Sequence, residues 1–209
     1  STDVQPFMLV HVTSDVYLPV EYDAAGNRIG TVTNLGLTVG VLPFKTVNME
    51  VGLDHKSGLG VLDDHPLYGN VKIGVPEGAF GTASPALAVG VFDVGTKSGL
   101  TDFNVFYGKI AKSFALDSVP LGRRSVGYFG GNDKLLVGPG GAADQQGLLV
   151  AWERTLIELS DRLWVCVEYM GTESAYGTLN FGAAWKFASN VGLLAGYDDF
   201  NNPDYPGAA

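Results

Sequence analysis

The chain has 209 residues, a net charge of −9 and a charged fraction of 17%. This acidic balance excludes a nucleic-acid binder of the usual kind, because phosphates require a basic patch. The one cysteine, Cys166, excludes an intramolecular disulfide and therefore the disulfide-stabilised secreted class.

Apolar and polar residues alternate over much of the first half of the chain, and this period of two is typical of β-strands. In chain order it predicts strands over 4–12, 35–41, 47–54, 70–75, 86–91 and 102–112. The last of these alternates imperfectly, because Phe106 and Ile110 share a parity with Asn104. We therefore predict a β-bulge in this strand.

The second half continues the pattern with strands over 124–130, 147–153, 163–170, 178–187 and 191–198. The last two are separated only by Ala188, Ser189 and Asn190, which have the length and chemistry of a hairpin turn. The final three segments are therefore predicted to form an antiparallel three-stranded meander. No helical segment is needed, and no composition shift divides the chain, so we predict one domain over 1–209.

The lengths of the connections indicate how these strands are arranged. Those after the first, third and seventh strands, 13–34, 55–67 and 131–145, are long, whereas those after the second, eighth and tenth, 42–46, 158–162 and 188–190, are short. Long connections at one end and short turns at the other are typical of membrane β-barrels. The predicted fold class is all-β: an antiparallel up-and-down transmembrane β-barrel of about 10–12 strands.

The last third of the chain, ELSDRLWVCVEYMG…YGTLNFGAAWKFASNVGLLAGYDDFNNPD, carries a resemblance to a known family. It resembles the C-terminal hairpins of small Gram-negative outer-membrane β-barrel proteins. In these proteins a turn containing Asn or Asp is followed by apolar alternation and a strand end like the Ala-Gly-Tyr-Asp of 195–198. The resemblance implies a porin-like barrel in the bacterial outer membrane, and it is specific to the barrel class rather than to one transport function.

The barrel interpretation assigns a side to every strand residue. Leu179, Phe181, Ala183, Trp185 and Phe187 are expected to face lipid, because they form the apolar parity of their strand. The opposite parity is expected to line a lumen. The predicted lumen-lining residues are Thr38, Asn48, Glu50, Asn70, Lys72, Asn104, Glu153, Glu168, Asn180 and Lys186. Two interpretations of their charges stay open, a polar passage for solutes or pairs that fill the interior.

Three functions remain open from the sequence. The first is a passive channel for small solutes or a surface anchor in the outer membrane, the second a closed structural or interaction barrel acting through its long connections, and the third a soluble all-β binding domain. The sequence predicts no enzyme, since it contains no recognisable catalytic, cofactor or metal pattern. The expected partners are the lipid bilayer and a protein bound through the long connections. Because bacterial barrels have even strand numbers, we expect either a further strand, from this chain or a partner, that closes the barrel, or a strand count of ten.

Overall fold

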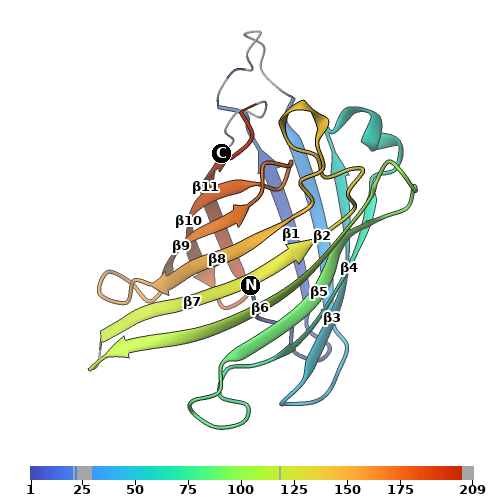
Figure 1. The fold of residues 1–209 in the computed structure, drawn as a ribbon. Helices are drawn as coiled ribbons and strands as arrows, with labels where there is room; N and C mark the ends of the chain where they lie inside the picture. Colours follow the sequence, from blue (N-terminus) through green and yellow to red (C-terminus); the bar gives the residue numbers. More distant parts are fainter. Residues whose placement is uncertain (21, 23–29, 118, 204–209) are drawn as a thin grey trace.

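The computed structural model describes residues 1–20, 22, 30–117 and 119–203. Within them the chain forms one antiparallel sheet in which each of eleven strands pairs with the next in sequence (Figure 1). The strands are β1 (Val10–Tyr17), β2 (Val32–Gly40), β3 (Asn48–Ser57), β4 (Leu67–Val75), β5 (Ala86–Gly95), β6 (Asp102–Leu116), β7 (Val119–Gly130), β8 (Gln146–Thr155), β9 (Leu163–Gly171), β10 (Thr178–Ala188) and β11 (Val191–Phe200). The all-β class is confirmed, as is the antiparallel meander of the last three strands.

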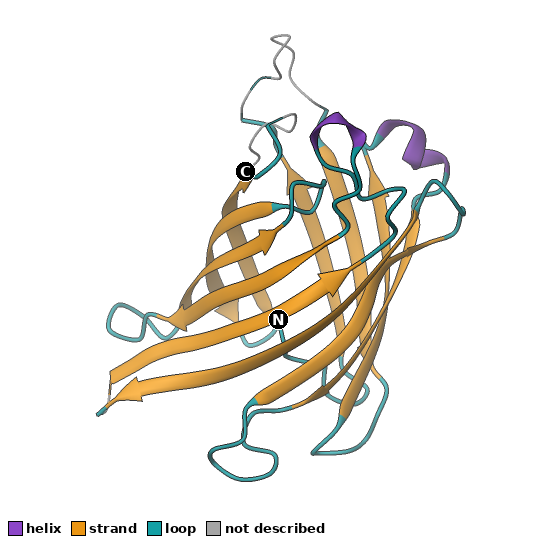
Figure 2. Ribbon diagram, in the orientation of Figure 1, coloured by secondary structure: helices purple, strands orange, loops and turns teal. Residues whose placement is uncertain are grey.

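Helical structure is confined to two short 3-10 segments in the described part of the chain, η1 (Gly60–Asp64) and η2 (Pro139–Gly141) (Figure 2). No helix among the described residues is long and apolar enough to span a membrane.

The first strand lies further along the chain than the sequence predicted. The prediction was 4–12, but β1 is Val10–Tyr17, and it includes Thr13 and Asp15, which were assigned to a connection. Both polar side chains have the inward parity of the sheet, where polar residues are common, so their polarity does not end the strand. The predicted connection 13–34 also includes residues 21 and 23–29, which lie outside the described residues.

The sheet has a concave and a convex face, as Figures 1 and 2 show from its curl. Contacts on the concave face join strands that are not neighbours: Lys109 of β6 lies near Glu168 of β9, and Lys56 of β3 contacts Asp93 of β5. The convex face is apolar and open. Phe181 and Trp185 are 47% and 40% exposed there, so they do not lie in a closed core.

The sheet is open in the described structure, because β1 and β11 pair only with β2 and β10. Both edge strands are odd-numbered and run in the same direction. One additional strand, antiparallel to both, therefore has the correct direction to pair with each edge.

Sequential antiparallel pairing sends successive connections to opposite ends of the sheet. The connections after odd-numbered strands, including 58–66, 131–145 and 172–177, lie at what we call the loop end. Those after even-numbered strands, including 41–47, 76–85, 156–162 and 189–190, lie at what we call the turn end.

An apolar cluster occupies the concave face toward the loop end. Val105, Phe129, Leu136 and Leu149 are buried, and Phe92, Phe103, Tyr107, Met170 and Tyr176 pack against them. Leu136 comes from the β7–β8 connection and Tyr176 from the β9–β10 connection, so two loop-end connections fold onto the sheet. Glycine makes room for these rings: a Cβ at Gly90 would lie 2.8 Å from the Tyr107 hydroxyl oxygen.

Candidate functional site

A cavity of about 320 Å³ lies on the concave face, below the apolar cluster. Its walls combine the aromatic rings of Phe92 and Tyr107 with charged and amide side chains from β3, β4, β6, β9 and β10. The polar lining residues are Ser1, Glu50, Asn70, Lys72, Lys109, Glu168 and Asn180. Polar groups that converge beside apolar walls are the usual composition of a small-molecule site.

Two lysine and glutamate pairs supply the charges of this cavity. Glu50 and Lys72 face each other on β3 and β4, with Lys72 Nζ 2.7 Å from Glu50 Oε1. Lys109 Nζ is 3.9 Å from Glu168 Oε1, so this second pair is looser than a direct hydrogen bond. The Lys109 side chain is only 8% exposed, whereas that of Glu168 is 43% exposed. The Lys109 ammonium is therefore the less well matched cation of the cavity.

The N-terminal segment, residues 1–6, crosses the concave face at the turn end. The Gln5 backbone N–H donates to Glu50 Oε2 at 2.6 Å, and Thr2 is only 4% exposed. A Cβ at Gly74 would lie 2.7 Å from Val4 Cγ2, so glycine at this position leaves space for the segment. The segment therefore bounds the cavity on its turn-end side.

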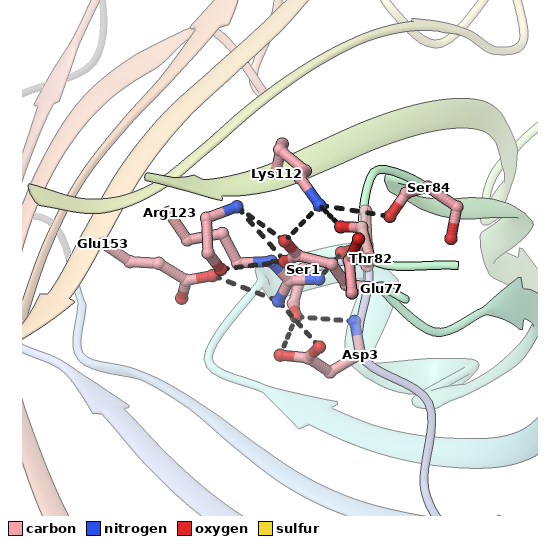
Figure 3. A network of polar contacts seen from close by, with 10 residues as sticks. Ser1, Asp3, Glu77, Thr82, Ser84, Lys112, Arg123 and Glu153 are labelled. Carbon is pink, nitrogen blue, oxygen red and sulfur yellow. Dashed lines mark hydrogen bonds and ion pairs between the residues drawn. The ribbon is translucent and has the colours of Figure 1, made fainter. Parts of the chain in front are cut away.

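Arg123 holds this segment in a charged network, which Figure 3 shows with Arg123 between carboxylates of different elements. Its guanidinium lies 2.7 Å from Asp3 Oδ1, 3.5 Å from Glu153 Oε1 and 4.0 Å from Glu77 Oε2, and it also donates to the Thr2 hydroxyl. One arginine thus joins the N-terminal segment, the β4–β5 connection and β8.

Glu77 links this network to Lys112 and Ser113 of β6. Its carboxylate accepts from the Ser113 backbone N–H and hydroxyl, and it lies 3.1 Å from Lys112 Nζ. Burial raises the pKa of Glu77, but the hydrogen bonds from Ser113 and Lys112 outweigh it, and the net pKa lies below the ordinary value. The carboxylate is therefore the favoured form.

A second group of polar contacts, centred on Asp93, lies at the loop end. Asp93 is 4% exposed and has a backbone φ of 53°, at a register shift between β5 and β6. Its two oxygens lie 2.6 and 2.7 Å from Lys56 Nζ, and it also accepts from the Tyr176 hydroxyl. Burial, followed by the charge of Asp93, raises the pKa of Tyr176 well above its ordinary value. The neutral phenol therefore holds the β9–β10 connection over the sheet.

Five of the ten residues predicted to line a lumen meet at the cavity: Glu50, Asn70, Lys72, Glu168 and Asn180. Glu153 lies instead in the turn-end network with Arg123, and Lys186 is exposed at the turn end of β10. Thr38 lies opposite Gly52 on the neighbouring strand, and Asn48 is half-buried at the first position of β3. Whether these residues line a water-filled lumen remains a prediction.

A β-bulge between β5 and β6 explains why alternation misassigned Asn104. Asn104 has a positive φ of 47° and lies opposite the register shift at Asp93, so parity does not fix the face to which it points. Lys109, Tyr107 and Arg123 were not predicted as site residues. Alternation over 105–111 alone, past the bulge, would have found the first two, because Tyr107 and Lys109 have the parity opposite to that of Phe106 and Ile110.

No protein-family model, curated protein or solved structure matches this chain. The geometry of the site is therefore the basis for any assignment of function. The cavity has the size and polarity for a small solute, and side chains bound it at both ends, by the apolar cluster on one side and the N-terminal segment on the other.

Proposed function

We propose that this chain forms a β-barrel of the bacterial outer membrane, completed by one additional strand between β1 and β11. The observation that carries the proposal is the division of the sheet into two chemically different faces. Aliphatic and aromatic side chains are exposed over the convex face, whereas the concave face contains ion pairs and amides. The apolar convex face is stable against hydrocarbon, whereas in water it would be a large exposed apolar surface.

We further propose that the barrel is occluded and has a structural or interaction role. Three features support this: the apolar cluster at the loop end, the N-terminal segment at the turn end and the direct pairing of Lys72 with Glu50. In this proposal the long loop-end connections are extracellular and bind the protein partner.

Passive passage of small solutes is the second candidate, and the cavity with its poorly matched Lys109 favours it. In this case the N-terminal segment and the connection carrying Tyr176 must move to open a path. The loosely paired lysine would then make the passage select anions over cations.

Gel migration tests the membrane proposal, because a folded membrane barrel migrates differently before and after boiling and requires detergent for extraction. Protein that stays in solution without detergent would instead support the soluble binding domain. Conductance across a planar bilayer separates the two membrane candidates. The occluded barrel should give no steady conductance, whereas a passage should conduct and should lose its anion preference in a Lys109→Gln variant.

A further inference from the structure

A hollow of about 660 Å³ lies on the convex face of β6 to β9. We call it the outer hollow. It shares the lining residues Val150, Glu168 and Tyr169 with the cavity on the concave face. Its floor is formed by Ile110, Val126, Val150 and Tyr169, which are neighbours across four strands and are between 40% and 49% exposed. Such a concave apolar surface is shaped to receive a hydrocarbon chain rather than a polar solute.

A row of two basic side chains and one indole borders this floor on its turn-end side. Lys112, Arg124 and Trp152 are aligned in register across β6, β7 and β8, and all three line the hollow. Trp152 is fixed by its indole N–H, which donates to the Leu121 carbonyl at 2.9 Å. An indole at the edge of an apolar band is typical of the interface between hydrocarbon and water.

Arg124 is the cation of this row that is available to a ligand. Lys112 Nζ is already engaged, 3.1 Å from Glu77 and 2.7 Å from the Thr82 carbonyl. Arg124 is exposed, and among the described residues it forms no ion pair; its guanidinium lies over the Phe114 ring, 5.4 Å from the centroid. Stacking occupies the face of a guanidinium but leaves its N–H groups free to bind a phosphate in the plane.

We propose that the outer hollow binds one anionic phospholipid, with Arg124 holding the headgroup phosphate and the apolar floor receiving an acyl chain. The assignment rests on the proposed function, in which the convex face meets a membrane. It also explains why an arginine is tolerated there. Arginine on a lipid-facing surface costs about 2–4 kcal/mol at the midplane but only about 0–1 kcal/mol near an interface.

Lipid retention by the full chain in a neutral detergent tests this assignment. The protein is mixed with equal amounts of phosphatidylglycerol and phosphatidylcholine of identical acyl chains, and bound lipid is counted by native mass spectrometry. We expect one phosphatidylglycerol per chain, retained about tenfold more strongly than phosphatidylcholine, as one charge-assisted contact would give. Inorganic phosphate at millimolar concentration should not displace it, because phosphate lacks the acyl chain.

Two variants with the same change of charge separate the site from general electrostatics. Arg124→Gln should abolish the preference, whereas Lys134→Gln, at an exposed position of the loop-end connection 131–145, should leave it unchanged. Brominated acyl chains supply a second measurement. They should quench part of the tryptophan fluorescence, and that part should disappear in a Trp152→Phe variant.

Equal retention of the two lipids, or an unchanged preference in Arg124→Gln, would overturn the assignment. Displacement by inorganic phosphate alone would also overturn it, since the hollow would then be a simple anion site. Failure of the membrane proposal is recognised separately, by a chain that neither requires detergent nor inserts into vesicles. A chain that inserts but shows no preference rejects only the lipid site.

Discussion

Arg123 and Arg124 are consecutive residues of β7 that point to opposite faces of the sheet. Arg123 is half-buried among Asp3, Glu77 and Glu153 on the concave face, whereas Arg124 is exposed beside the Phe114 ring on the convex face. Their different surroundings predict different consequences of the same substitution.

Arg123→Gln should destabilise the protein by about 1–3 kcal/mol, because it leaves the partly buried carboxylates of Glu77 and Glu153 without their shared cation. The measurement is the midpoint of urea unfolding in detergent micelles. Arg162→Gln, at an exposed position of the β8–β9 connection, is the matched control and should change stability by less than about 0.5 kcal/mol. Equal effects of both variants would mean that the network contributes nothing beyond net charge.

The contact of Asp93 with Lys56 and Tyr176 predicts a graded response to substitution. Tyr176→Phe should cost about 1 kcal/mol, because it removes one hydrogen bond and leaves the ion pair intact. Lys56→Met should cost about 3–5 kcal/mol, because it leaves the buried carboxylate of Asp93 without a cation. Adding Asp93→Asn to Lys56→Met should recover much of that loss, and a double variant no more stable than Lys56→Met would contradict the account.

Glu77 predicts a dependence of stability on acid pH. Its pKa in the folded protein lies below its ordinary value of 4.5, so its contribution is complete above that value and is lost as the pH falls through the folded pKa. The melting temperature of the native chain should therefore decrease more steeply between pH 5 and pH 3 than that of the Glu77→Gln variant. The other carboxylates are the same in both proteins, so the difference between the two curves reports on Glu77. Parallel curves for the two proteins would show that Glu77 is not preferentially ionised in the fold.

The proposal that the convex face meets lipid predicts a cost that depends on depth. Val89, in the middle of β5, and Val191, at the turn-end start of β11, are 59% and 53% exposed. In a bilayer Val89→Arg should cost about 2–4 kcal/mol and Val191→Arg about 0–1 kcal/mol. Unfolding titrations of vesicle-inserted protein measure the difference. In a soluble domain the two exposed positions should tolerate arginine equally.

The proposed orientation predicts where protease reaches the protein in intact cells. The connection 131–145 lies at the loop end and should be cut, whereas residues 189–190 lie at the turn end and should be spared. Cell lysis should expose the turn end and provides the control. Cleavage at 189–190 alone in intact cells would show that the orientation is inverted.

Alternation along the sequence predicted the strands well where both faces are regular. In β10, Leu179 and Phe181 alternate with Asn180 and Gly182, and a strand has only two faces, so local pattern determines which residues lie together. The same reasoning failed at β1, where Thr13 and Asp15 are polar but belong to the strand. The imperfect alternation of β6 correctly predicted its bulge, where Phe103 and Asn104 together oppose Asp93. The face of Asn104 could not be assigned, because alternation is interrupted at the bulge itself.

The sequence by itself therefore determined an all-β chain of antiparallel strands in sequential order, with an apolar and a polar face. Only the tertiary structure decided which polar residues meet. Lys109 reaches Glu168 because the sheet curls and brings β6 and β9 within a side-chain length of each other. Arg123 reaches Asp3 because the N-terminal segment crosses the concave face. Strand twist and curvature accumulate over many residue pairs, so no single stretch of sequence encodes them. The open edges of β1 and β11 likewise follow from the pairing of the whole sheet and not from either strand alone.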